Sequence, residues 1–284
     1  MPAVTAVSIA VDARRLAESI SPTDMTVISR RRLLRNAGLL GGAFALDLPL
    51  SATDSKAGAA EQPGAARKLK VMVAGGHPGD PEYGCGGTIA RFTSLGHEVA
   101  LLYLNRGDPS AKSPDAGSGV RVEEAKNACA ILKARPMYAG QIDGNAVIDR
   151  AHYDEFRRII ASEQPDAVFT HWPIDNHADH RAISMLVYDT WLKLGKKFAL
   201  YYYEVSDGED TVQFAPTHYV DISQTEAQKR KACYAHASQA PEKFYKLQEL
   251  VTRMRGMESG HTQAEGFIHH VQSPEFALPK GESK

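Results

Sequence analysis

Cysteine is scarce in this sequence: three residues among 284, widely separated at positions 85, 129 and 233. The odd number excludes a framework in which every cysteine is paired, and there is no C-x-x-C pair to suggest a redox motif or a structural zinc site. We therefore expect Cys85, Cys129 and Cys233 to be buried apolar residues without a chemical role.

Net charge is nearly absent as well, since 33 Lys and Arg face 34 Asp and Glu, which gives −1. This balance argues against a general attraction to nucleic acid or anionic lipid, so no nucleic-acid partner is expected. The sequence lacks an internal repeat, and its hydrophobic fraction of 43% and charged fraction of 24% are typical of a globular protein. The length suits one large domain beyond a leader segment, and no pattern sets an oligomeric state.

No hydrophobic run is long enough for a stable membrane span. The apolar stretch from Ala37 to Leu50 is shorter than the ~20 residues that a spanning helix needs. It follows the basic segment Ser29–Arg35 (SRRRLLR), and together they resemble a twin-arginine export signal. We interpret residues 1–67 as a signal segment and linker, removed or disordered in a periplasmic or extracellular protein, and residues 68–284 as the catalytic domain. A disordered basic tail or a weak membrane anchor is the alternative.

Short apolar runs alternate with longer amphipathic segments after residue 68. The expected strands are 69–74, 99–104, 167–172 and 198–205, and the expected helices are 84–95, 120–133, 152–163, 178–194 and 223–238. Because the runs are continuously hydrophobic, the strands should be covered on both faces. This predicts an α/β fold, a three-layer α/β/α sandwich with a mostly parallel, Rossmann-like sheet. Ser223 and Glu226 predict a capping box at the start of the last helix.

The first cluster of chemically active residues follows the strand that ends at Ala74. The segment reads GGHPGDPEYGCGG, with His77 and Asp80 on one tight loop. A neutral imidazole and a carboxylate suit a divalent ion such as zinc. A dinucleotide site is disfavoured because Ile89 occupies the position of its third glycine. The alternative is a surface turn in which His77 and Asp80 are incidental.

The second cluster, PIDNHADHR, follows the strand 167–172 and enters a helix. His177 and His180 are three residues apart and share a face in a first helical turn. Asp179 lies between them and can fix an imidazole tautomer. The alternative is a solvated polar helix start. Together the two loops can supply two histidines and one carboxylate, which leaves a coordination position for water, as in catalytic zinc sites.

These residues resemble the PIG-L/LmbE-like family of zinc-dependent N-acetylglucosaminyl deacetylases, whose motifs read A-H-P-D-D and H-x-D-H. The resemblance continues through Asn105–Asp108, Arg121 with Glu124, Asp143, Val220–Ser223, His236–Gln239 and Ala264–Phe267. It implies that His77, Asp80 and His180 ligate Zn²⁺, with Fe²⁺ as another possible metal. It implies that His177, oriented by Asp179, stabilises the oxyanion or protonates the leaving amine. Arg121 and Asp143 match positions that hold substrate hydroxyls, and Asp108 stands where the family usually has Glu.

One departure concerns the general base, which in the family is the Asp directly after H-P. That position is Gly79 here, and its hydrogen side chain cannot accept a proton. We favour Asp175 as the substitute base. Glu82 is a second candidate, and a catalytically degenerate protein a third.

The favoured function is therefore metal-dependent removal of an acetyl group from an N-acetylated amino sugar or a related glycoconjugate by attack of metal-activated water. A degenerate carbohydrate-binding member of the family is the alternative. A non-haem iron oxygenase, which also uses two His and one carboxylate, is a third hypothesis. Its ligands are expected on an antiparallel barrel, whereas this chain alternates strand and helix.

Overall fold

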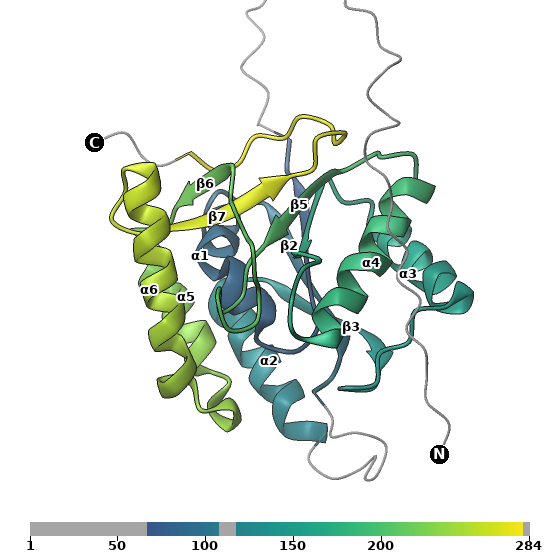
Figure 1. Cartoon of the computed structure of the whole chain (residues 1–284), viewed down its shortest axis with the longest axis horizontal. Helices are drawn as coiled ribbons and strands as arrows, with labels where there is room; N and C mark the ends of the chain where they lie inside the picture. Colours follow the sequence, from purple (N-terminus) through teal and green to yellow (C-terminus); the bar gives the residue numbers. More distant parts are fainter. Residues whose placement is uncertain (1–66, 108–117, 281–284) are drawn as a thin grey trace, which may run out of the picture. The chain divides into compact units, whose positions relative to one another are not determined.

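The computed structural model describes residues 67–107 and 118–280, and within that range the chain folds into a seven-stranded sheet between two layers of helices (Figure 1). The elements are, in chain order, β1 (Lys70–Gly75), α1 (Asp80–Ser94), β2 (Glu98–Asn105), α2 (Ser118–Leu132), β3 (Arg135–Gln141), α3 (Arg150–Glu163), β4 (Ala167–His171), α4 (Ala178–Lys193), β5 (Ala199–Tyr203), β6 (His218–Asp221), α5 (Glu226–Tyr234), the 3₁₀ turn η1 (Ala237–Gln239), α6 (Pro241–Ser259) and β7 (Ala264–His269). The predicted leader, apart from Arg67, lies outside the described residues.

The strand order is β3-β2-β1-β4-β5-β7-β6, and the first five strands in that order are parallel. Only β7 runs against its neighbours β5 and β6 among the described strands. The sheet is therefore mostly parallel, and its β3-β2-β1-β4-β5 part has the strand order of the Rossmann fold. The predicted fold class is confirmed.

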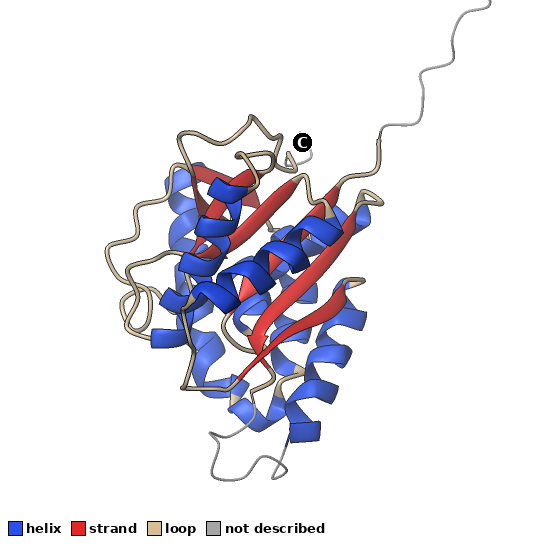
Figure 2. Cartoon of the chain, turned by 90° about the vertical axis from the view of Figure 1, so that its right-hand side faces the viewer, coloured by secondary structure: helices blue, strands red, loops and turns tan. Residues whose placement is uncertain are grey.

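Helices cover both faces of the sheet. Figures 1 and 2 show α3 and α4 on one face, whereas α1, α2 and α5 lie on the other. Successive residues of β1 alternate between the two apolar cores: Val71 and Val73 pack into one, and Met72 and Ala74 into the other. This alternation with both faces covered explains why the strand reads as a continuous hydrophobic run.

Three smaller expectations can be checked against the described residues. The cysteines are all buried and free, as predicted. The capping box at Ser223 is wrong: α5 has Thr225 as its N-cap, and the Ser223 hydroxyl donates instead to Asp221 Oδ1 at 2.6 Å. No helix in the described part is long and apolar enough to cross a membrane.

The positions of β1 and β4 create the place where a site can form. These two strands are adjacent and parallel, but the chain leaves β1 toward β2 on one side and leaves β4 toward β5 on the other. Loops that diverge in this way open a crevice at the carboxyl ends of the strands, where α/β proteins bind their ligands. Both sequence clusters follow these two strands.

Candidate metal centre and active-site pocket

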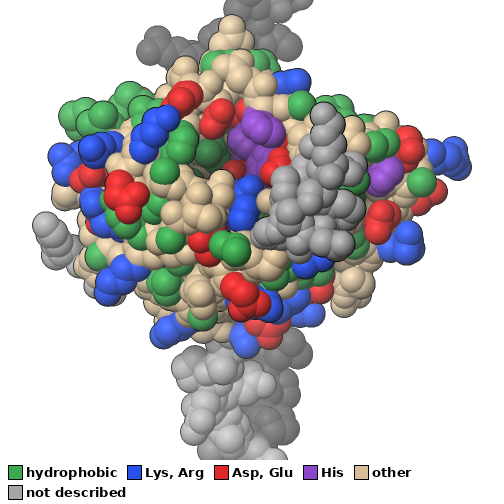
Figure 3. Space-filling view, turned by 90° about the horizontal axis from the view of Figure 1, so that it is seen from below, with side chains coloured by type: hydrophobic (Ala, Val, Ile, Leu, Met, Phe, Trp, Pro, Cys, Tyr) green, Lys and Arg blue, Asp and Glu red, His purple; other side chains and the backbone are tan. Residues whose placement is uncertain are grey.

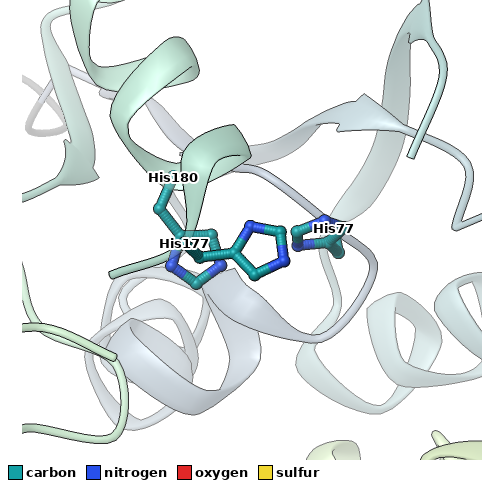
Figure 4. A group of neighbouring side chains, drawn as sticks. All are labelled: His77, His177 and His180. Atoms are coloured by element: carbon teal, nitrogen blue, oxygen red, sulfur yellow. The ribbon is translucent and has the colours of Figure 1, made fainter. Parts of the chain in front are cut away.

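The carboxyl ends of β1 and β4 bring together side chains about a hundred positions apart in sequence. His77 follows β1 and Asp80 begins α1, while His177 is the N-cap of α4 and His180 lies in its first turn. The rings of His77 and His177 have their centroids 4.6 Å apart, and those of His177 and His180 are 4.7 Å apart. The three imidazoles lie next to one another (Figure 4), with one nitrogen of each within 4.8 Å of the others.

The carboxylate of Asp80 is the centre of this cluster. Its Oδ2 lies 3.2 Å from Nδ1 of His77 and 3.2 Å from Nε2 of His180. The same oxygen accepts the backbone N–H of His77 at 2.8 Å. Burial alone would raise the pKa of Asp80, but the charges of His180 and His77 hold it well below its ordinary value. Asp80 is therefore ionised and fixed in place, as a metal ligand must be.

The pKa values of two histidines are shifted in the opposite direction, upward. Burial would lower the pKa of His180, but the charge of Asp80 and hydrogen bonds with Asp175 and Asp80 raise it to about 9. The pKa of His77 is likewise raised well above its ordinary value, against burial, by Asp80, Asp143 and Asp179. In the metal-free protein, protons on these rings balance the carboxylates that a cation would otherwise balance.

The donor atoms fit a divalent metal. Within the described residues, three overlapping sets of side chains have ligand atoms within 4.8 Å of one another: His77 with His177 and His180, Asp80 with His171 and His180, and His77 with Asp143 and Asp179. Imidazole nitrogen with carboxylate oxygen suits zinc and its first-row neighbours. The predicted ligands His77, Asp80 and His180 each belong to at least one of these sets, although no single set holds all three.

Two glycines shape the loop beneath the ligands. A Cβ at Gly76 would lie 3.0 Å from Cδ2 of His180 and 3.1 Å from Oδ2 of Asp80, so a side chain there would press on both residues. Gly79 has φ 116° and ψ −41°, a conformation that residues with a side chain rarely adopt, although a Cβ there would meet nothing closer than His236 at 3.9 Å. The missing base thus coincides with a backbone shape that requires glycine.

Asp175, which we favoured as the substitute base, makes contacts that suit a different role. Its Oδ1 lies 3.1 Å from Nδ1 of His180 and accepts the backbone N–H of His177 at 2.8 Å, while Oδ2 accepts the hydroxyl of Thr211 at 2.9 Å. The side chain is fully buried, and both oxygens are occupied. This is the arrangement of a carboxylate that orients a metal-binding histidine.

Asp179 also differs from its predicted role. Its Oδ2 lies 3.1 Å from Nε2 of His77 and accepts hydrogen bonds from Asn105 Nδ2 and the Gly144 backbone. The carboxylate therefore orients His77. Asp179 hydrogen-bonds to the His177 ring through its backbone N–H, which donates to Nδ1 at 3.2 Å. Because Nδ1 accepts a hydrogen, a neutral His177 carries its own proton on Nε2.

An open pocket of about 360 Å³ lies over the cluster. Figure 3 shows the histidines in this hollow, with acidic and basic side chains beside them. Arg121 and Asp143 both line it: Nη1 of Arg121 lies 3.5 Å from Oδ2 of Asp143, and Oδ1 of Asp143 lies 3.1 Å from Nε2 of His77. The structure thus brings these two predicted substrate-binding residues to the pocket, whereas Asp108 lies outside the described residues.

Two residues at this site, His171 and Asp210, carried no recognised signal in the sequence. His171 ends the buried strand β4, stacks on His180 at 4.0 Å, and accepts the backbone N–H of Gly76 on Nε2. Burial and the charge of His180 lower its pKa to about 4, so it is neutral. Asp210 lines the pocket from a segment that has no metal-ligand spacing. His236, from the segment His236–Gln239 that contributes to the family resemblance, lines the pocket as well.

A Rossmann-like sheet with a histidine and carboxylate cluster at its switch point defines an α/β protein built to hold a metal beside an open pocket. The sequence matches a particular family within that class. Residues 72–191 match the family model described as PIG-L: GlcNAc-PI de-N-acetylase. The chain therefore has a PIG-L-like region over residues 72–191, as the motifs indicated.

Relatives support this assignment. The diacetylchitobiose deacetylase of Thermococcus kodakarensis is 28% identical over 217 residues, which are 69% of this chain and 81% of that protein. The N,N'-diacetylchitobiose deacetylase of Pyrococcus horikoshii has a similar fold, with a TM-score of 0.62, 24% identity, and coverage of 71% of this chain and 84% of that one. A hydratase shares the fold too: GalB, the 4-carboxy-2-hydroxymuconate hydratase of Pseudomonas putida, with a TM-score of 0.61, 22% identity, and coverage of 74% and 99%.

Proposed function

We propose that this chain is a zinc-dependent hydrolase that removes the acetyl group from an N-acetylated amino sugar or a related glycoconjugate. The observation that carries the proposal is the position of Asp80, whose Oδ2 lies 3.2 Å from an imidazole nitrogen on each of the two sequence clusters. The PIG-L match and the deacetylase relatives support the reaction class and the type of substrate.

The residues of the site have separate roles in this reaction. His77, Asp80 and His180 would hold the metal. When bound, zinc polarises the amide carbonyl and makes water a stronger nucleophile near neutral pH. The Nε2 proton of His177 can be donated to the carbonyl oxygen, on which negative charge develops. Arg121 and Asp143 line the same pocket and can bind the hydroxyl groups of the sugar.

Acetate release tests this proposal. The purified protein is freed of metal with a chelator, reloaded with Zn²⁺ or Fe²⁺, and incubated with N-acetylglucosamine, N,N'-diacetylchitobiose and an N-acetylated glycopeptide. We expect acetate and a free amine in equal amounts, dependent on the metal. Equal amounts distinguish amide hydrolysis from the addition of water, the reaction named for GalB. Saturable sugar binding without acetate would instead favour a carbohydrate-binding protein, and iron-dependent oxygen consumption would favour an oxygenase.

We also propose that the protein is exported through its twin-arginine-type leader. The proposal rests on the arginine run Arg30–Arg32 followed by the apolar stretch Ala37–Leu50. Cell fractionation of the full chain should find the protein outside the cytoplasm, and replacing Arg30 and Arg31 by Lys should retain it inside. Equal export of both forms would contradict this proposal without affecting the proposed reaction.

A further inference from the structure

Hydrolysis of an amide needs a group that accepts a proton from the attacking water, and Gly79 cannot supply one. Asp175 has both carboxylate oxygens occupied, as described above. Glu82 is fully buried, and its Oε1 accepts the Tyr103 hydroxyl at 2.7 Å and lies 3.1 Å from Nε2 of His236. Neither carboxylate lines the pocket over the histidines. The two candidates from the sequence therefore face protein partners and not the substrate.

A third carboxylate does face the pocket. Asp210 lies in the segment between β5 and β6 and lines the same pocket as His77, Asp80 and His180. It is half-buried. Within residues 67–107 and 118–280, its carboxylate has no hydrogen-bond or ion-pair partner. Among the acids lining this pocket it is thus available to a water or a substrate.

The backbone around Asp210 is firmly attached to the loop that carries the histidines. The N–H of Asp210 donates to the carbonyl of Ser206 at 3.0 Å, and its own carbonyl accepts the N–H of Asn176 at 2.8 Å. The next residue, Thr211, forms an antiparallel bridge with Asp175 and donates its hydroxyl to that carboxylate. The backbone of Asp210 is therefore held at a fixed place relative to the loop that carries His177 and His180, so its side chain starts from a defined position at the pocket.

The electrostatic surroundings also suit a base. The pKa of Asp210 is raised above its ordinary value. Burial is the largest cause, and the charges of Asp175 and Asp80 also raise the pKa, whereas the charge of His180 lowers it. A carboxylate with a raised pKa takes a proton from water more readily than an exposed one. The same interactions show that Asp210 lies within the field of the metal-binding residues.

We propose that Asp210 is the catalytic base, in place of the carboxylate that Gly79 lacks. The inference rests on the proposed deacetylation and deepens it. An Asp210 oxygen takes one proton from a water molecule while the water oxygen forms a bond to the carbonyl carbon of the acetyl group. The C–N bond then breaks, the proton passes to the leaving nitrogen, and the products are acetate and the free amine. Water is the only co-reactant.

Asp210→Asn tests the proposal because it removes the charge and keeps the shape. We expect kcat for acetate release to fall by about 100-fold to 10,000-fold, while zinc content and KM stay within about twofold of the original protein. Glu209→Gln is the matched control: Glu209 is the exposed neighbour in the same segment, and the change removes the same charge. Its kcat should stay within about twofold.

A second measurement does not depend on turnover. The protein is loaded with Co²⁺, and the visible spectrum is followed as the pH is raised. A negative charge beside the metal disfavours loss of a proton there, so Asp210→Asn should move the midpoint of the spectral change to lower pH by about 1 unit. Glu209→Gln should leave the midpoint in place.

The outcomes separate the two proposals. Full kcat in the zinc-loaded Asp210→Asn protein overturns Asp210 as the base and leaves the deacetylation intact. Loss of the metal from this variant overturns it as well, because the residue would then support the metal site. If the unaltered protein releases no acetate from any substrate, the proposed function fails. In that case the cobalt spectrum still tests the position of Asp210. If Asp210→Asn leaves the midpoint of the spectral change where it is, Asp210 does not lie beside the metal.

Discussion

Oδ1 of Asp175 lies 3.1 Å from Nδ1 of His180, on the other side of the ring from Oδ2 of Asp80, which is 3.2 Å from Nε2. A carboxylate at Nδ1 holds the ring hydrogen there and leaves the Nε2 lone pair for a metal. The tautomer and orientation of His180 are thus set by a residue that does not face the pocket.

Asp175→Asn should therefore weaken metal binding. We expect the zinc affinity to fall by about 10-fold to 100-fold, the usual effect of losing such a carboxylate. Thr211→Val, which removes only the hydroxyl that donates to Asp175, should have a smaller effect. Competition with a chromophoric chelator measures both. Undiminished affinity together with a large loss of turnover would support the base role predicted for Asp175 from the sequence.

Asp80→Asn should have a larger effect than either change. The substitution keeps the size of the side chain but removes the charge on the oxygen that lies nearest to the imidazoles of His77 and His180. We expect zinc affinity to drop by more than about 100-fold, beyond the range for outer residues. Metal analysis after dialysis gives the result. Retention of one zinc per chain would show that Asp80 is not a ligand.

The pKa values also predict how metal binding depends on pH. The pKa of His180 in the folded, metal-free protein is raised to about 9, whereas an unfolded histidine titrates near 6.5. Only the neutral ring binds zinc, so apparent affinity should rise by about tenfold per pH unit between pH 6.5 and 9 from this proton alone. The stability of the metal-free protein should change in the opposite direction and fall as the pH rises. The stabilisation from His180 is complete below pH 6.5 and is lost as the pH rises to about 9.

Titration calorimetry in two buffers of different ionisation enthalpy counts the protons released when zinc binds. Chemical denaturation of the metal-free protein across the same range measures the second effect. Affinity that does not change between pH 6.5 and 9 would contradict the raised pKa. The metal-free Asp80→Asn protein is the control, because it lacks the charge that raises the pKa of His180 and should show a weaker dependence.

The parallel half of the fold was predictable because its strands are buried on both faces and read as apolar runs. The rest was not. The edge strand β3 is only partly buried, β6 has four residues, and β7 pairs antiparallel with its neighbours. None of these produces a continuous hydrophobic run. Helix α6, which begins at Pro241, was missed although proline commonly occupies a first helical position.

Part of the site was likewise predictable from the sequence, and part was not. His77, Asp80, His177 and His180 were found because a tight loop or a single helical turn brings them together, and local spacing reveals that. The partners of Asp175 and Asp179, and the position of Asp210 in the pocket, depend on contacts between segments that only the folded sheet aligns. Spacing along the chain carries no information about which imidazole a carboxylate will meet.

Arg121→Lys should separate substrate binding from metal binding. The guanidinium donates from Nη2 to the Pro78 carbonyl at 3.0 Å and lies beside Asp143 at the pocket wall. Lysine keeps the charge but cannot form both contacts with one planar group. We expect KM for the N-acetylated substrate to rise by about 10-fold, the equivalent of one hydrogen bond to a charged group, with zinc content unchanged. An unchanged KM would place the sugar elsewhere in the pocket.

Gly79→Ala should destabilise the protein through backbone strain alone. A Cβ at this position has room, since its nearest neighbours are His236 and Tyr83 at 3.9 to 4.0 Å, but φ of 116° with ψ of −41° disfavours any side chain. We expect the unfolding free energy of the metal-free protein to fall by about 1–3 kcal/mol in urea. Gly119→Ala is the control, because Gly119 lies in α2 with nothing near its Cβ position, and its stability should stay equal or rise by up to about 1 kcal/mol. Equal stability of Gly79→Ala would mean that the loop relaxes to an ordinary conformation, and an aspartate could then return to this position as a base without cost. A loss in the expected range would mean that a side chain at this position costs backbone strain, which favours a base from another segment.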